Sequence, residues 1–186
     1  VPGEPKLFDE ADLGKTFRKF ISIIYNSFVF LETYGQKVES QKSKVKSLNI
    51  LDKWVLARLN QTIVDATENL EKYDIGGAGK ELEIFTDDLS RWYIRRSRSR
   101  LQKPENQNDF ESASATLHRC LLELSKLLAP FTPFFAEALF LSLNNESGIM
   151  NKEKNGSHDS VPSGHLSKGD KFIIRNSVHL QDWPEA

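Results

Sequence analysis

The chain has 186 residues, of which 39% are hydrophobic and 27% are charged, and its formal net charge is -1. These values, with a mean hydropathy of -0.46, indicate one globular domain and exclude a membrane-spanning helix, since no apolar run approaches the roughly 18 residues that such a helix needs. The single cysteine, Cys120, excludes an internal disulfide and a cysteine-based zinc site built from this chain alone.

A first helix is predicted to begin near Phe17 and to end at Gly35. The stripe on its main apolar face is widened by Phe20, Ile23 and Phe30, so we expect this helix to be buried on more than one side. The apolar residues that repeat at steps of four and three, and therefore share one helix face, are Phe17, Ile21, Ile24, Phe28 and Leu31. The polar stretch that follows is predicted to be an exposed connection.

A second helix is predicted from about Asp52 to Lys72, with Asp52 as its N-cap. Asp74 is placed to cap a third helix, which continues to Pro104, where the missing amide and the proline ring end it. The apolar row of the second helix is Leu56, Leu59, Ile63, Ala66 and Leu70, extended by Tyr73.

A fourth helix is predicted from about Phe110 to Ala129, and Pro130 ends it. Thr132 and Pro133 are the N-cap and first-turn residues of a short fifth helix. The apolar positions of the fourth helix are Ala113, Leu117, Cys120, Leu121, Leu124, Leu127 and Leu128.

The last part of the chain differs in composition from the helices. Residues 144–170 are rich in Asn, Ser, Gly and Lys, so they are predicted to form a flexible loop. Residues 171–186 regain apolar side chains and are expected to form an extended segment that packs back on the helices. The predicted fold is therefore all-α, an antiparallel bundle of about five helices over residues 1–143.

Five arginines lie among the fifteen residues from Asp87 to Leu101. At about 100° per residue, Arg91, Arg95 and Arg98 share one narrow face of the third helix. A row of guanidinium groups matches closely spaced phosphates and favours the release of counterions from nucleic acid. A solvated face, favoured by the helix dipole at a C-terminus, explains the same row without any function.

The apolar arc of the third helix contains two of the arginines. This arc indicates the core side and carries Leu82, Phe85, Leu89, Trp92 and Tyr93. Arg96 and Arg100 fall inside the arc, and ion pairing at the end of the bundle is the favoured interpretation for both. For Trp92 and Tyr93, core packing is favoured over stacking on a nucleic-acid base.

No catalytic, cofactor-binding or metal-binding residue is predicted. The glycine-rich residues 76–81 lack the first glycine of a phosphate-binding loop and carry Glu where Ser or Thr would bind the metal ion. None of the histidines has a partner at metal-ligand spacing; they are His118, which we expect to be a satisfied boundary residue, His158, His165 and His179.

Four segments, in this order, resemble one known family: LDKWVLARLNQTI, YDIGGAGKELEIFTDDLSRWYIRRSRSRL, LLELSKLLAPFTPFFAEALF and SVHLQDWPEA. Together they are similar to the helical anticodon-binding domain of isoleucyl-tRNA synthetases, which are class I aminoacyl-tRNA synthetases. The opening, with residues 1–14 as a junction, resembles the passage from the catalytic domain. LAPFTPFFAE is similar to valine, leucine and methionine enzymes as well, whereas the arginine-rich helix is more typical of isoleucine enzymes; the valine and leucine enzymes stay as alternatives.

The resemblance implies a division of labour within a larger ligase. ATP and Mg²⁺ would act in a catalytic domain whose HIGH and KMSKS signatures do not occur in this chain. This chain would use no cofactor, bind isoleucine tRNA, pack on the catalytic domain of the same parent chain, and be a cytoplasmic monomer without membrane contact. The expected tRNA-binding residues are Arg91, Arg95, Arg98 and Lys103, together with Arg96 and Arg100.

Two other functions are weighed against tRNA binding. A helical scaffold would use the arginines only for intramolecular ion pairs and would support the catalytic domain. An independent enzyme would need a cleft with an acid or base of perturbed pKa, and the sequence indicates none.

Overall fold

The structure is a computed structural model that describes residues 9–35, 49–144 and 177–186. In these ranges it is helical and contains no strand, which confirms the predicted all-α fold. The predicted exposed connection after Gly35 and nearly all of the predicted flexible loop, residues 144–170, lie outside the described residues. None of the helices in the described part of the chain combines the length and the apolar character that crossing a membrane requires.

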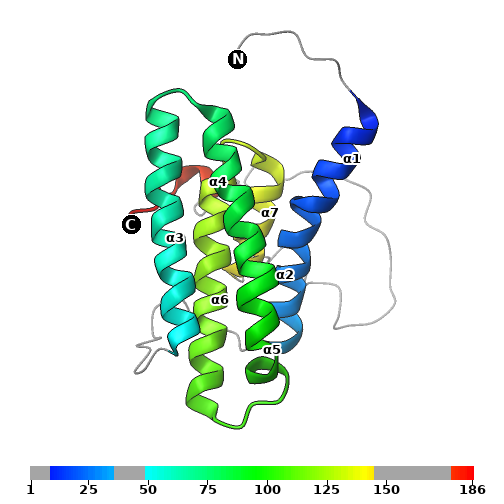
Figure 1. The fold of residues 1–186 in the computed structure, drawn as a ribbon, viewed down its shortest axis with the longest axis vertical. Coiled ribbons are helices and arrows are strands. Elements are labelled where there is room, and N and C mark those ends of the chain that lie inside the picture. The colour runs from blue at the N-terminus through cyan, green and yellow to red at the C-terminus, as the bar shows by residue number, and fades with distance from the viewer. Residues whose placement is uncertain (1–8, 36–48, 145–176) are drawn as a thin grey trace, which may run out of the picture.

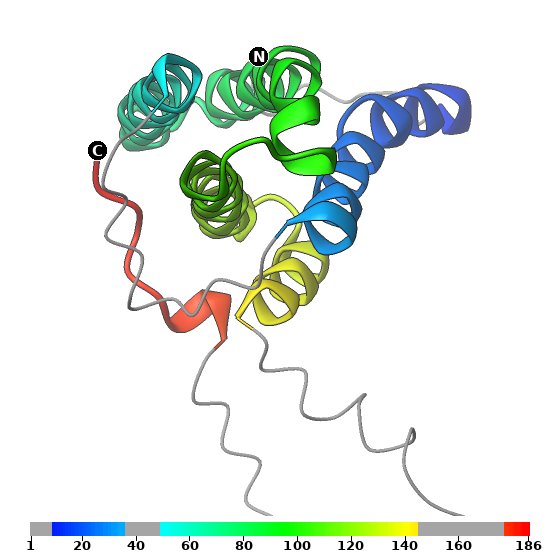
Figure 2. The same cartoon turned by 90° about the horizontal axis from the view of Figure 1, so that it is seen from below.

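The long helices pack side by side along one axis of the molecule (Figure 1). They are α3 (Ile50–Glu71), α4 (Ile75–Asp87) and α6 (Gln107–Leu128), and α2 (Ile21–Tyr34) lies beside them. Seen from below, α6 lies in the middle, surrounded by its neighbours and by the C-terminal residues (Figure 2). This position explains why α6 is buried along its length.

The N-terminal helix differs from its prediction. Two helices, α1 (Glu10–Lys19) and α2, meet at Phe20, where the backbone leaves helical geometry. Phe17 is 56% exposed, and α1 has no buried residue. On α2 only Ile24, Ser27 and Leu31 are buried, so the expected burial on more than one side is wrong. Gly35 ends α2 as predicted.

The start of α3 is a second correction. Asn49 is the N-cap, and its side chain accepts a hydrogen bond from the amide of Leu51 at 3.1 Å. Asp52 therefore lies within the first turn, where it is fully buried. At the other end of α3, Tyr73 is 86% exposed with a positive φ of 59°, so it does not extend the apolar row.

The predicted third helix is continuous but not uniform. It consists of α4, the π-helical segment η1 (Asp88–Ile94) and α5 (Arg95–Gln102). Asp74 caps α4 as predicted, because its carboxylate accepts a hydrogen bond from the amide of Gly77 at 2.9 Å. In Figure 1 this helix runs down the front of the bundle, from the turn after α3 at the top to α5 at the bottom.

The fourth and fifth helices agree with the prediction in position. All seven predicted apolar residues of α6 are buried. The last helix, α7 (Pro133–Leu143), begins after Thr132 with Pro133 in its first turn. The hydroxyl of Thr132 makes no capping hydrogen bond, so Thr132 is the N-cap by position only.

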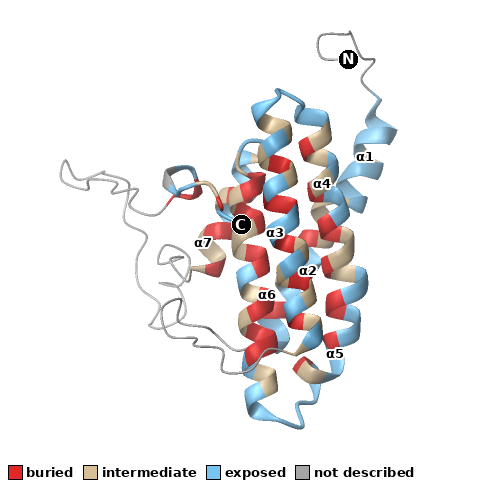
Figure 3. Ribbon diagram, turned by 60° about the vertical axis from the view of Figure 1, so that its left-hand side comes forward, coloured by how far each residue is buried: buried red, intermediate tan, exposed pale blue. Residues whose placement is uncertain are grey.

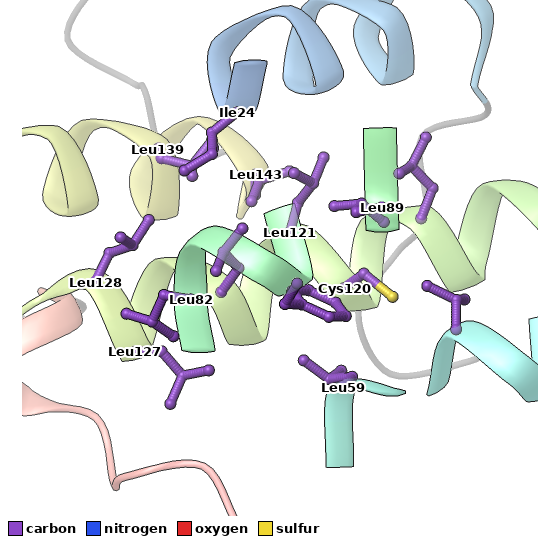
Figure 4. Packing of buried hydrophobic residues seen from close by; sticks show 14 of the residues in the cluster. Ile24, Leu59, Leu82, Leu89, Cys120, Leu121, Leu127, Leu128, Leu139 and Leu143 are labelled. Carbon is purple, nitrogen blue, oxygen red and sulfur yellow. The ribbon is translucent and has the colours of Figure 1, made fainter. Parts of the chain in front are cut away.

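One hydrophobic core joins these helices. Side chains from α2, α3, α4, η1, α6 and α7 point toward one another in Figure 4, among them Ile24, Leu59, Leu82 and Leu121. Figure 3 shows the buried residues along the inward faces of the helices. Burial raises the pKa of the Cys120 thiol to about 12, so this side chain is protonated at neutral pH and packs as an apolar residue.

The C-terminal residues 177–186 lie against the bundle. They contain one short 3₁₀ turn, η2 (Val178–Leu180), and are otherwise not helical. The carboxylate of Glu137 on α7 accepts hydrogen bonds from the Ser177 hydroxyl at 2.9 Å and from the Val178 amide at 2.8 Å. The indole of Trp183 donates to the hydroxyl of Thr67 at 2.7 Å. The expected packing of the final segment on the bundle is therefore confirmed for these residues.

Candidate nucleic-acid interface

Arg91, Arg95 and Arg98 form an exposed row, which we call the arginine ridge. The side chain of Arg91 is 69% exposed, and its Nε forms an ion pair with Asp87 at 2.6 Å. Among the residues that the structure describes, Arg95 and Arg98 form no ion pair with a carboxylate. The ridge therefore presents two guanidinium groups without an acidic partner in the described chain, and a third whose partner is itself partly exposed.

The π-helical segment keeps one row of side chains on this helix facing the core. From Phe85 onward one buried row recurs at steps of four, and Thr86 and Ile94 are buried beside it. The row consists of Phe85, Leu89, Tyr93, Ser97 and Leu101. An α-helix has 3.6 residues per turn, so side chains spaced by four residues would drift gradually around it. A π turn contains more residues than an α turn, and this compensates for the drift and keeps the row facing the core. Arg91, Arg95 and Arg98 are exposed and lie on the other side of the helix from this row.

Arg98 also contacts the neighbouring helix α2. Its guanidinium carbon lies 5.8 Å from the centroid of the Phe30 ring, and Phe30 in turn packs on Tyr34 with ring centroids 5.1 Å apart. This distance permits a weak cation-π attraction, worth about 0.5–1 kcal/mol at exposed sites. The ridge thus borders an aromatic pair on α2.

Arg96 and Trp92 contradict their predictions. Both were expected on the core side, but Arg96 is exposed and Trp92 is 51% exposed. The guanidinium carbon of Arg96 lies over the indole ring, 4.6 Å from its centroid. The physical reason is the π-helical segment, which brings Tyr93 and Ser97 into the core at the positions that a plain α-helix would give to Trp92 and Arg96.

Arg100 lies inside the end of the bundle, as the position in the apolar arc indicated. Its side chain is 10% exposed and donates to both oxygens of Asp52, each at 2.8 Å. It also donates to both oxygens of Asp109 at the start of α6, each at 2.7 Å. The hydroxyl of Tyr93, which is fully buried, donates to Asp52 at 2.8 Å. This cluster joins α3, η1, α5 and α6.

The pKa shifts in this cluster follow from burial and charge. Burial by itself lowers the pKa of Arg100, but hydrogen bonds to Asp52 and Asp109 outweigh it, so the pKa is raised above its ordinary value. The Arg100 guanidinium lowers the pKa of Asp109. Burial, and then the charge of Asp52, raise the pKa of the Tyr93 hydroxyl. At neutral pH Arg100 is therefore a cation, Asp109 is a carboxylate and Tyr93 is a neutral phenol.

Lys103 is exposed at the C-cap of α5 and extends the positive surface beyond the ridge. The nearby acidic residue Asp88 does not remain unpaired, because Nε of Arg58 on α3 donates to its carboxylate at 2.9 Å. Thus one acid beside the ridge is neutralised by α3, and another, Asp87, pairs with Arg91.

No other feature of the described chain indicates a catalytic or metal site. The ring Nε2 of His118 donates to the carbonyl of Leu143 at 3.1 Å, which satisfies it as expected. The structure brings no metal-binding group of His, Cys, Asp or Glu together among its described residues. His158 and His165 lie outside them, and His179 is exposed.

The glycine-rich start of α4 does not offer a phosphate site. The carboxylate of Asp74 already accepts from the amide of Gly77, so a negative group occupies the helix N-terminus. A pocket of about 210 Å³ lies between α3, α6 and the C-terminal residues, away from the ridge. It is smaller than the roughly 300–1,000 Å³ of typical small-molecule sites.

Sequence reasoning missed the partners of Arg100 and the exposure of Trp92. The partner Asp52 is 48 residues away in the chain, and no local pattern marks it. The exposure of Trp92 did have a signal, which is the run of inward residues at steps of four. One residue of this run, Ser97, is polar, so a pattern that counts only apolar residues does not detect the run.

The comparisons with known proteins agree on one family. The sequence profile described as "Anticodon-binding domain of tRNA ligase" matches residues 52–186. A protein of Dehalococcoides mccartyi (strain CBDB1) named isoleucine-tRNA ligase is 42% identical over 145 residues, which cover 76% of this chain and 14% of that protein.

Proteins of the same name give similar results in two other bacteria. In Clostridium novyi (strain NT) the identity is 36% over 188 aligned positions, which cover 100% of this chain and 16% of the relative. In Deinococcus radiodurans it is 41% over 148 positions, or 78% of this chain and 14% of the relative. The chain thus spans about one seventh of the length of the relatives that it matches.

Proposed function

This chain belongs to the family of anticodon-binding domains of tRNA ligases, and from this premise we propose that it binds the anticodon stem and loop of isoleucine tRNA as part of an isoleucine-tRNA ligase. The whole protein would use ATP and Mg²⁺ to attach isoleucine to its tRNA, in a catalytic domain outside this sequence. Within that protein, a cytoplasmic monomer, the bundle would pack on the catalytic domain.

The observation that carries this proposal is the exposure of the arginine ridge. Its guanidinium groups lie on one side of a rigid helix whose opposite side is fixed in the core. Phosphates of RNA are spaced closely enough to meet several such groups, and each contact releases counterions. The net charge of -1 does not oppose this, because a local cluster of cations sets the potential that RNA meets.

The expected tRNA contacts do not all have the same support. Arg91, Arg95, Arg98 and Lys103 are exposed and can reach a phosphate. Arg100 is 10% exposed, and its guanidinium is already bound by two carboxylates. We therefore assign Arg100 to the integrity of the bundle and leave it out of the proposed RNA contacts.

A titration of the 186-residue chain with isoleucine tRNA at several salt concentrations tests the proposal. We expect binding that weakens as salt rises, and a double charge reversal, Arg95→Glu with Arg98→Glu, should weaken it further at low salt. Loss of two phosphate contacts should flatten the slope of log affinity against log salt by roughly 1 to 2 units. A double reversal at the opposite end of the α3-α4 hairpin, Lys72→Glu with Lys80→Glu, changes the charge equally and serves as the control.

Two results would contradict the proposal. One is the absence of binding by the unaltered chain at low salt, and the other is an equal loss of affinity in the ridge and control variants. Isoleucine tRNA should also bind more tightly than valine or leucine tRNA if the parent protein is an isoleucine enzyme.

The scaffold function has one observation in its favour, which is the Arg100 cluster. In that cluster one arginine of the helix is held by two carboxylates of the same chain. If the whole helix had this role, the ridge variant would melt at a lower temperature and bind tRNA with unchanged affinity. The same two variants therefore separate the two functions.

A further inference from the structure

Trp92 is an exposed aromatic side chain in the π-helical segment η1, whose other apolar residues, Leu89, Tyr93 and Ile94, are buried. Its neighbour Tyr93 is fully buried, whereas Trp92 is 51% exposed. A single exposed hydrophobic residue is common and needs no function. Trp92 differs because a cation lies on its ring and because two exposed arginines, Arg95 and Arg96, lie one turn further along the helix.

The guanidinium of Arg96 and the indole of Trp92 form a layered pair. The guanidinium carbon lies 4.6 Å from the ring centroid. Both groups are planar, and both stack on nucleic-acid bases, the indole through its π face and the guanidinium through its delocalised plane. Even with Arg96 above it, half of the Trp92 side chain remains accessible.

The backbone beneath this pair is held firmly. The hydroxyl of Tyr93, next to Trp92, donates to the buried carboxylate of Asp52 at 2.8 Å, and Ser97, next to Arg96, is fully buried. The pair is therefore anchored on its inward side by residues whose places are fixed. Such preorganisation reduces the entropy that a stacking contact would lose on binding.

We propose that Trp92 and Arg96 form a stacking site for one unpaired base of an RNA loop, beside the phosphate contacts of the arginine ridge. This inference rests on the proposed tRNA binding and adds a site that recognises a base rather than the backbone. Four exposed guanidinium groups, those of Arg91, Arg95, Arg96 and Arg98, lie within eight residues of chain and supply the charge that brings RNA to the ring.

The chemistry of the surface favours an unpaired base over two other occupants. A duplex keeps its bases stacked on one another, so it could use the ridge but not the indole ring. The core of a protein-protein interface is depleted in charged residues. The exposed neighbours of Trp92 one turn along this helix, Arg95 and Arg96, are cationic, so the surface does not favour a protein partner.

The test compares two RNAs and three variants of the 186-residue chain. The RNAs are a transcript of the isoleucine tRNA anticodon stem and loop, and a blunt duplex with the same stem and no loop. The variants are Trp92→Ala, Trp92→Phe, which keeps an aromatic ring, and Phe134→Ala as the control. Phe134 is 90% exposed and lies in the first turn of α7, on another part of the bundle.

Trp92→Ala should weaken binding of the stem and loop by at least about fivefold. It should change duplex binding by less than about twofold. Trp92→Phe should lie between the unaltered chain and Trp92→Ala, and Phe134→Ala should bind both RNAs as the unaltered chain does. The stem and loop should also quench the tryptophan fluorescence of the unaltered chain more than that of Trp92→Phe, because Trp54 and Trp183 remain in both.

Each other outcome has a distinct meaning. Unchanged stem-loop affinity in Trp92→Ala, with weakening by the Arg95 and Arg98 reversal, overturns the stacking site and leaves the tRNA proposal intact. Equal losses for both RNAs in Trp92→Ala, with an unchanged melting temperature, also overturn it. No binding of either RNA by the unaltered chain at low salt rejects tRNA binding and the stacking site together.

Discussion

Asp52 is a fully buried carboxylate whose two oxygens are both satisfied. Arg100 donates to each oxygen, and the hydroxyl of Tyr93 donates to one of them. A buried ion pair of this kind adds little net stability compared with a well-packed apolar pair, because both charges have left water. Removing only one partner is much more harmful, since it leaves an uncompensated charge in the interior.

Replacing Arg100 should reveal this asymmetry. We expect Arg100→Met to lower the free energy of unfolding by about 3 kcal/mol or more, measured by urea denaturation. Adding Asp52→Asn should recover part of the loss, because an amide can still accept from Tyr93 and carries no charge. The control Arg96→Met, at an exposed position, should lose less than about 1 kcal/mol. A double variant less stable than Arg100→Met would refute this account.

The sequence predicted the role of Arg100 in part. A cation within the apolar arc of a helix indicated an ion pair, which is correct. The identity of the partners could not be predicted, because Asp52 at the start of an apolar run also fits the ordinary pattern of an N-cap. Asn49 takes the capping position instead, and the burial of Asp52 follows from tertiary packing of α3 against η1 and α6.

At the scale of the element, the start of α4 shows two glycines with different surroundings. Asp74 caps the helix by accepting from the amide of Gly77. A Cβ at Gly77 would collide with the Asp74 carboxylate, whereas a Cβ at Gly76 would find its nearest atom, an oxygen of Asp74, at 3.7 Å. Only Gly77 is therefore required by a close approach.

Alanine substitutions at these glycines should have different effects. Gly76→Ala should raise the free energy of unfolding by up to about 1 kcal/mol, because alanine favours the helix over glycine. Gly77→Ala should lack this gain, since the new methyl group displaces a cap worth about 0.5–2 kcal/mol. Chemical denaturation of both variants measures the difference, and equal stabilisation would show that the cap is unimportant.

The π-helical segment explains the largest error in the candidate site. The helical wheel used a constant 100° per residue, which places Trp92 in the core arc. That angle applies to α4 but not to η1, which begins at Asp88. Periodicity is read from apolar residues, and the first buried position on the face after the π-helical segment is a serine, Ser97, which an apolar pattern does not register. The ridge was still predicted correctly as outward, because Arg91, Arg95 and Arg98 lie opposite the stripe in either geometry.

On the scale of the whole molecule, α6 is the central helix and the C-terminal residues cover part of the bundle (Figure 2). These residues are held by hydrogen bonds and by apolar packing: Glu137 binds Ser177 and Val178, Trp183 binds Thr67, and Val178 and Trp183 pack on the hydrophobic core. The segment's own hydrogen bonds run from His179 to Ser177 and from Gln181 to Ser177 and Val178, so its position on the bundle depends on the contacts with α3, α6 and α7.

Trp183→Phe should loosen this segment without unfolding the bundle. The substitution keeps an aromatic ring but removes the 2.7 Å hydrogen bond to Thr67, a loss of about 1 kcal/mol. Hydrogen exchange at the amides of Val178 and Gln181 should become faster, while exchange in α6 stays unchanged. Thr67→Val should accelerate exchange at the same amides. The double variant should exchange little faster than either single variant, because both substitutions remove the same hydrogen bond. Fully additive effects would contradict a shared hydrogen bond.

Most of the bundle could be predicted from the sequence because its helices are long and their apolar residues recur regularly. The seven predicted core positions of α6 are the clearest case. Irregular geometry could not be predicted in the same way: the break at Phe20, the positive φ of Tyr73 and the π turns leave no mark in the apolar periodicity of the sequence. The tRNA contacts themselves stay predictions, because periodicity shows which side chains face outward and not what they bind.

The π-helical segment has a consequence for comparing members of this family. A relative with the same number of residues between positions 88 and 94 but with α-helical turns throughout would have every later side chain turned by roughly 100°. Two proteins could share the letters RRSRSR and still offer different arginines to the same nucleic acid. A sequence alignment alone does not show that aligned arginines make the same contacts in two relatives. The direction in which each side chain faces on its helix has to be compared as well.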